Sequence, residues 1–267
     1  MIVRRTCCAL ALTLALGGCA AQEAPRVELP VRVDCGRVTG AGAAVTTDLG
    51  YEVTVTDARL ALGGLVFTIA GEVHTAPLMQ RLSDALVPRA RAHPGHYQGG
   101  EVTGELPGDF ALRCAQDQDR ELGLATLIVG TYTAANFDFE RGSVALGLDA
   151  GDALIGHTLW LSGTATRDGA SIAFTVVVDS PLDRQLVGAP FEVSVPADAT
   201  GALLFRFELL DDLEGDTLFD GLDFALLDPG MSGEVLIAPD VAAVEDAYDA
   251  LRRTFQTHDH FRVDYQE

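Results

Sequence analysis

The stretch His157–Asp179, HTLWLSGTATRDGASIAFTVVVD, decides the fold class of this chain. Apolar and polar residues alternate on both sides of Asp168-Gly169, as they do in strands that bury one face. An Asp-Gly pair between two such runs is the strongest short-range signal for a two-residue hairpin, because both turn positions need a positive φ. The stretch therefore predicts two antiparallel strands.

The same alternation continues on both sides of this hairpin. Single strands are predicted by VELPVRVDC, YEVTVTDARLAL, GLVFTIAGEV, GEVLIAP and HDHFRVDYQE, and pairs of strands by LGLATLIVGTYTAANFDFERG and PFEVSVPADATGALLFRFELL. Many short strands with turn signals between them are typical of all-β proteins. We predict one antiparallel β-sandwich domain over residues 31–267.

Two segments depart from the strand pattern. Residues Asp240–Phe255 predict the one long helix, preceded by Pro239, and its apolar stripe is Val241, Val244, Ala247, Tyr248 and Leu251. From His74 to about Leu106 the sequence is irregular, with a short helix expected before Pro88. A connection of this length inside a β domain is usually functional.

The N-terminus has the features of an export signal. Arg4 and Arg5 precede the apolar run Cys7–Leu16, which is too short to span a bilayer, so residues 1–18 are expected to be a signal peptide. Leu16-Gly17-Gly18-Cys19 resembles the bacterial lipobox, which implies that Cys19 becomes the lipidated first residue of the mature protein. The alternative is an ordinary cleaved signal with a chance cysteine.

Residues 19–30 are then the lipidated cysteine and a polar, proline-bounded tether. Ala20 follows the lipidated position, where the resemblance associates Asp with retention at the inner membrane. The expected location is therefore the outer membrane, lipid-anchored and facing the periplasm.

Only Cys35 and Cys114 remain once the signal cysteines and Cys19 are set aside. In an oxidising compartment two cysteines most simply form a disulfide. Such a bridge would stabilise the fold by roughly 4 kcal/mol on the chain-entropy estimate. The alternative is a pair of thiolates that ligate a soft metal.

The chain is strongly acidic, with 39 Asp and Glu against 18 basic residues and a formal net charge of −21. This field argues against nucleic acid or anionic lipid as a partner and favours cations or a cationic protein surface. Membrane attachment would then depend on the lipid of Cys19.

His93-Pro94-Gly95-His96 predicts a metal site. Pro and Gly at the central positions indicate a type II turn, which brings the first and fourth Cα atoms within about 7 Å. Two neutral imidazoles held this way suit copper or zinc, and Glu101 could complete or orient the ligand set. The alternative is a surface turn whose histidines bind backbone carbonyls.

The other histidines are candidates to complete the metal shell. His258 and His260 would share one face of a strand, although a solvated tail is the alternative. His74 and His157 lie at strand ends, where a sandwich gathers its loops, and each alone is more often structural.

The sequence gives little support for a calcium site or for an enzyme active site. The acidic stretch Leu209–Asp228 offers oxygen ligands for calcium, but its spacing fits no EF-hand loop, and a solvated acidic segment is the preferred interpretation. No nucleophile elbow, P-loop, dinucleotide fingerprint or HExxH helix is found, so no enzyme is predicted. A hydrolase that uses metal-activated water near Glu101 is the alternative.

Three segments resemble the β-sandwich copper-binding lipoproteins that are partners in methanobactin operons. They are Val55–Leu65, Leu122–Gly142 and Leu204–Gly221, with Gly130-Thr131-Tyr132 and Leu218-Phe219-Asp220-Gly221 at positions similar to the family's. The resemblance implies an all-β periplasmic protein that handles copper or another transition metal, often beside a TonB-dependent receptor.

The predicted function is therefore capture or hand-off of copper or zinc by a lipoprotein through its loop histidines, with an outer-membrane receptor as the partner. The alternative is a lipid-anchored interaction module that binds a receptor, peptide or glycan without metal.

Overall fold

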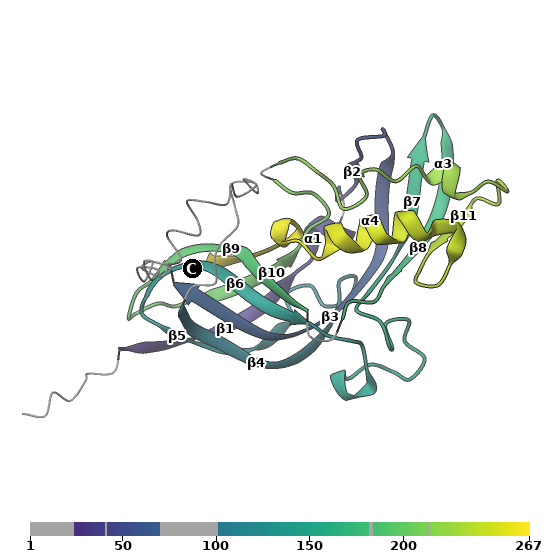
Figure 1. The fold of residues 1–267 in the computed structure, drawn as a ribbon. Helices are drawn as coiled ribbons and strands as arrows, with labels where there is room; N and C mark the ends of the chain where they lie inside the picture. The colour runs from purple at the N-terminus through teal and green to yellow at the C-terminus, as the bar shows by residue number, and fades with distance from the viewer. Residues whose placement is uncertain (1–23, 41, 70–100, 182–183, 213) are drawn as a thin grey trace, which may run out of the picture.

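The structure is a computed structural model that describes residues 24–40, 42–69, 101–181, 184–212 and 214–267. Hydrogen bonding joins twelve strands into one large mixed open sheet, with a helix near the C-terminus (Figure 1). The prediction of an all-β protein is confirmed. Two separate stacked sheets are not shown, because a continuous path of ladders connects the described strands.

The strands are β1 (Arg26–Asp34), β2 (Val45–Thr46), β3 (Glu52–Ile69), β4 (Glu101–Arg113), β5 (Glu121–Ile128), β6 (Gly130–Phe139), β7 (Leu159–Arg167), β8 (Ala170–Val178), β9 (Gln185–Val195), β10 (Ala202–Phe207), β11 (Glu234–Ile237) and β12 (Phe261–Gln266). The α-helices are α1 (Gly36–Thr39), α3 (Phe224–Leu227) and α4 (Glu245–Phe255). Short 3-10 helices are η1 (Val144–Leu146), η2 (Ala242–Val244) and η3 (His258–His260). Strand β1 begins at Arg26, inside the segment predicted to be tether.

The main path through the sheet runs β11-β8-β7-β3-β4-β5-β1-β10-β12, with β2 and β6 also paired to β3 and β9 paired to β6. Most neighbours are antiparallel, but β1 pairs with β10 and β8 pairs with β11 in parallel, so the sheet is mixed rather than antiparallel. Strand β9 packs beside β12, yet no ladder joins these two described strands. The sheet therefore curls until two of its edges lie side by side without backbone pairing.

Strand β3 is long, and its two parts pair with different strands along one edge (Figure 1). Its first part, Glu52–Leu60, pairs with β7, and its last part, Leu62–Ile69, pairs with β6. On its other edge the ladder to β4 skips Gly64 on one strand and Pro107-Gly108 on the other. Two residues opposite one form a β-bulge, and both glycines there have a positive φ. The expectation of an irregular segment as far as about Leu106 is therefore wrong at its end, because β4 begins at Glu101.

The β7–β8 hairpin is confirmed. Its ladder runs from Leu159 opposite Val178 to Arg167 opposite Ala170. Asp168 and Gly169 have φ values of 53° and 82°, as a type I′ turn requires. The two strands predicted within PFEVSVPADATGALLFRFELL form as β9 and β10, but they are not neighbours: β9 pairs with β6, while β10 pairs with β1 and β12.

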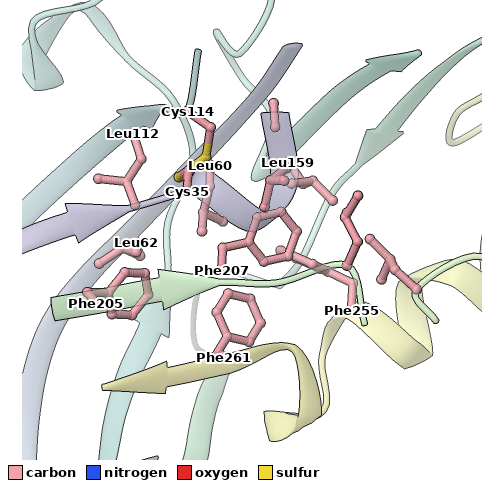
Figure 2. Close-up of a cluster of buried hydrophobic side chains, with 14 of the residues drawn as sticks. Cys35, Leu60, Leu62, Leu112, Cys114, Leu159, Phe205, Phe207, Phe255 and Phe261 are labelled. Atoms are coloured by element: carbon pink, nitrogen blue, oxygen red, sulfur yellow. A yellow bond between two sulfur atoms is a disulfide. The ribbon is translucent and has the colours of Figure 1, made fainter. Parts of the chain in front are cut away.

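The predicted helix forms as η2 followed by α4. Of the predicted stripe it buries Val244, Ala247 and Leu251, while Val241 and Tyr248 are partly buried; Phe255 is buried as well. Phe255 joins an aromatic cluster with Phe205, Phe207 and Phe261, and the rings of Phe207 and Phe261 stack at 5.3 Å (Figure 2). Buried aromatic rings of this kind supply much of a core's apolar area.

The predicted disulfide is confirmed. Cys35 and Cys114, which follow β1 and β4, are bonded to each other and almost completely buried, beside Leu60 and Leu112 (Figure 2). The bridge fixes the ends of two strands that are not neighbours in the sheet.

Candidate functional site

A groove of about 1280 Å³ lies where β9 packs beside β12. Its walls come from β9, β10, β12, η3 and the segment that follows β10. Val187 and Glu192 on β9 line one side, and Arg262 and Asp264 on β12 line the other. The groove exists because these two strands pack together without forming a ladder.

Alternating ion pairs cover the β10–β12 wall of this groove. Arg206 on β10 is directly opposite Arg262 on β12. Asp264 accepts from Arg206 at 2.7 Å and from Arg262 at 3.0 Å, and Asp34 lies 2.9 Å from Arg206 Nε. The carboxylates thus separate two guanidinium groups that would otherwise repel each other.

A second ion-pair cluster includes two carboxylates that line the groove, Glu208 and Asp212. Arg37 on α1 donates to Glu208 at 3.1 Å and to Asp212 in a shorter contact. The Glu208 side chain is only 5% exposed. Burial raises its pKa, although the hydrogen bond and charge of Arg37 act in the opposite direction. The hydrogen bond from Arg37 lowers the pKa of the more exposed Asp212.

His258 and His260 do not lie on a strand. They form η3, the 3-10 turn that leads from α4 into β12. His258 lines the groove and its Nδ1 lies 2.8 Å from Asp259, whose pKa this contact lowers to about 2. His260 is instead 1% exposed, and its Nδ1 has no hydrogen-bond partner. The two imidazoles therefore occupy different environments.

His157 lies just before β7 and is held by a carboxylate. Its Nδ1 is 2.7 Å from Asp179 Oδ1, while Arg141 lies 3.5 Å from the other oxygen of Asp179. A carboxylate on one ring nitrogen fixes the orientation of an imidazole and directs the other nitrogen outward, as in many metal sites. Within the described residues, however, His157 and Asp179 belong to no group of three or more His, Cys, Asp or Glu that could hold a metal ion.

The remaining predicted ligands lie outside the described residues. These are His74, His93 and His96, together with the predicted lipidation site Cys19. Glu101 is described only through its backbone, which pairs with Ile69 at the end of β3. Across the described part of the chain no group of three or more His, Cys, Asp or Glu could hold a metal ion. In the same residues no helix is long and apolar enough to cross a membrane.

The acidic stretch Leu209–Asp228 serves local structure. Asp223 caps α3 by accepting from Ala225, and Asp228 accepts from the amides of Ser232 and Gly233. Asp228 is 7% exposed, so the expectation of a wholly solvated segment is wrong at this position. Carboxylates that accept backbone hydrogen bonds in turns need no cation to be satisfied.

A group of three carboxylates that sequence reasoning missed surrounds the bulge in β3. A Cβ atom added to Gly63 would lie 2.4 Å from Asp109 Oδ1 and 3.1 Å from Glu140, and one added to Gly64 would lie 3.3 Å from Asp138. Burial and the charges of Asp109 and Asp138 raise the pKa of Glu140. The Gly-Gly pair inside a strand pattern was the available signal, since it often marks close approach of other groups.

No protein-family model matches this chain, and no curated protein or solved structure shows significant similarity.

Proposed function

We propose that this chain is a lipid-anchored protein that captures or hands off a copper or zinc ion through the connection between β3 and β4. The observation that carries the proposal is the pairing of Ile69 with Glu101, which brings both ends of that connection together. Three of the six histidines lie between these two residues.

The register limits how far apart these histidines can be. His74 follows Ile69 by five residues, and His96 precedes Glu101 by five. Because an extended residue spans at most about 3.6 Å, five residues reach at most about 18 Å. We therefore expect His74 and His96 to bind near the same end of the ladder. A type II turn at Pro94-Gly95, as the sequence predicts, would place His93 near His96. Neutral imidazoles and a carboxylate suit Cu(II) or Zn(II).

The rest of the proposal concerns location and partner. A lipid on Cys19 would anchor the domain to the outer membrane on its periplasmic side, and a TonB-dependent receptor would exchange the ion with it. The net charge of −21 favours accumulation of cations near the protein. No enzymatic activity is part of the proposal.

The test is isothermal titration of the Ala20–Glu267 chain with Cu(II) and with Zn(II). One-to-one binding is expected, lost in a His93→Ala/His96→Ala variant and retained in His157→Ala, which removes a histidine at another place in the sheet. Absence of binding, or equal binding by all three proteins, would rule the proposal out.

The groove between β9 and β12 supports a second candidate, a module that binds an extended peptide of a partner. Its volume of about 1280 Å³ exceeds the roughly 300–1,000 Å³ of common small-molecule pockets. Unpaired strand edges can also accept an added strand.

A photo-crosslinking residue introduced in cells at Val187, in the groove, should then capture a partner. The same residue at Leu236 on β11, which is 50% exposed and does not line the groove, is the matched control. Equal labelling at both positions would speak against a partner in the groove.

A further inference from the structure

The start of β1 lies at one end of the curled sheet, where several other strands also begin or end. Arg26, the first residue of β1, pairs with Ile128, the last residue of β5. The amide of Val129 donates to the carbonyl of Pro25 at 2.9 Å, which extends this ladder by one residue. Strand β6 begins at the same place, opposite the end of β9.

Strands β3 and β4 complete this end of the sheet. Ile69, the last residue of β3, pairs with Glu101, the first residue of β4, and with Tyr132 near the start of β6. The hydroxyl of Tyr132 donates to the carbonyls of Ile128 at 2.7 Å and Thr103 at 3.2 Å, which ties β4 and β6 to the end of β5. We call these strand ends the β1 rim, which comprises Pro25–Arg26, Ile69, Glu101–Val102 and Ile128–Thr131.

Little chain separates the β1 rim from the predicted lipidation site. The hydrogen bond from Val129 holds Pro25, which follows Cys19 by only six residues. Six extended residues span at most about 22 Å. A lipid on Cys19 is part of the proposed function, and this inference rests on it. Such a lipid would keep the β1 rim within that reach of the bilayer.

The acidic stretch Leu209–Asp228 reaches the opposite end of β3. Strand β3 leaves the β1 rim and is 18 residues long, a path of up to about 60 Å. Just before its start, the amide of Asp48 donates to Asp220 at 2.9 Å, and the hydroxyl of Tyr51 donates to Asp223 at 2.6 Å. Figure 1 accordingly shows β1 and β5 at one end of the molecule and α3 at the other.

The two ends differ in the chemistry that they offer to a bilayer. On the β1 rim Val102 is 54% exposed, and Pro25 and Arg26 are exposed as well. Apolar side chains and a guanidinium group both suit the boundary between lipid headgroups and water. Carboxylates such as Asp220 and Asp223 at the other end are repelled by anionic lipids.

We propose that the β1 rim contacts the surface of the bilayer that holds the lipid, while α3 and the turn of the β7–β8 hairpin point away from it. The short chain between Cys19 and Pro25 brings this rim, rather than the acidic end, to the lipid surface. Ile69 and Glu101, the two ends of the β3–β4 connection, lie on the rim. A receptor embedded in the same membrane would therefore meet the protein on the side where that connection emerges.

Tryptophan fluorescence of the lipidated full chain tests this orientation. The protein is reconstituted in vesicles of phosphatidylethanolamine and phosphatidylglycerol, with or without lipids that carry a quenching nitroxide on the headgroup. Trp160 is the only tryptophan of the chain, so Trp160→Phe provides a silent background. In this background Val102→Trp should lose emission in the nitroxide vesicles. Leu226→Trp on α3, at an apolar position that is 77% exposed, should keep its emission.

Three results would overturn the proposal: equal quenching of the two variants, quenching of Leu226→Trp alone, and quenching of neither. Thr131→Trp, at an exposed position of the same rim, takes the place of Val102→Trp if that variant does not unfold cooperatively. The lipid anchor is tested separately by sedimentation. The lipidated chain should sediment with the vesicles, and the Ala20–Glu267 chain should stay in the supernatant. If both stay there, the proposed anchor is wrong, whereas a sedimenting chain with the wrong quenching pattern refutes only the orientation.

Discussion

Arg206 and Arg262 face each other across the β10–β12 ladder, and Asp264 lies within 3.0 Å of both. Like charges directly opposite in a sheet are destabilising, so this pair depends on the carboxylate between them. The arrangement places a charged ladder along β12, a strand at the end of the path through the sheet.

Replacement of Asp264 by Asn should therefore destabilise the fold. We expect a loss of about 1 kcal/mol in the free energy of unfolding, because these partly exposed ion pairs are screened by solvent. Urea denaturation measures this loss. Asp249→Asn, which removes one exposed partner of Arg252 on α4, should cost less than about 0.5 kcal/mol. Equal losses in the two variants would contradict the special role of Asp264.

Removal of the disulfide should cost more than any single surface change. Cys35 and Cys114 are 79 residues apart in the chain, and release of a loop of this size raises the entropy of the unfolded chain by an amount worth about 4 kcal/mol. A Cys35→Ala/Cys114→Ala variant should show this loss in urea denaturation. Dithiothreitol should destabilise the wild-type protein and leave the variant unchanged; destabilisation of both would mean that the reductant acts elsewhere.

The hairpin turn offers a test of backbone strain. Gly169 has a φ of 82° with open space around it, so an added Cβ meets no neighbour and only the backbone conformation opposes it. Gly169→Ala should lower the free energy of unfolding by about 1 kcal/mol. Gly151 is also surrounded by open space but lacks a positive φ. The melting temperature of Gly151→Ala should stay near that of the wild type, and a matching fall would argue against strain as the cause.

The carboxylates around the bulge predict a pH-dependent gain in stability. Burial and two neighbouring carboxylates raise the pKa of Glu140, so the folded state holds its proton more tightly than the unfolded chain. The ionised form opposes folding, and this opposition disappears as pH falls through the raised pKa. Glu140→Gln should therefore stabilise the protein by about 0.5 kcal/mol at pH 7 and by nothing at acidic pH. Destabilisation at pH 7 would show that the ionised carboxylate is favourable.

Local patterns predicted local structure well. The alternation around Asp168-Gly169 found the β7–β8 hairpin, the apolar stripe found α4, and the cysteine count found the disulfide. The hairpin and the helix are determined by residues close together in the chain, and the disulfide follows because only two cysteines were left to pair. A single sequence was therefore sufficient to predict all three.

Long-range pairing could not be predicted in the same way. The alternation of β10 is compatible with a parallel or an antiparallel partner, and nothing local shows that β10 pairs with β1. The His258-Asp259-His260 segment could equally extend as strand, but it forms the 3-10 turn that leads from α4 into β12. The groove forms where β9 packs beside β12, which are far apart in the sequence, so its position could not be predicted either. The metal ligands His93 and His96 remain a prediction from sequence.

The length of β3 has a consequence for how this protein unfolds. One strand carries the ladder to β7 in its first part and the ladder to β6 in its last part. Neither half of the molecule can melt without removing pairing partners from the other, so heat and denaturant act on a single cooperative unit. For the same reason, a protease cut within β3 would not release two autonomous folding units, because each fragment would keep only part of a shared core.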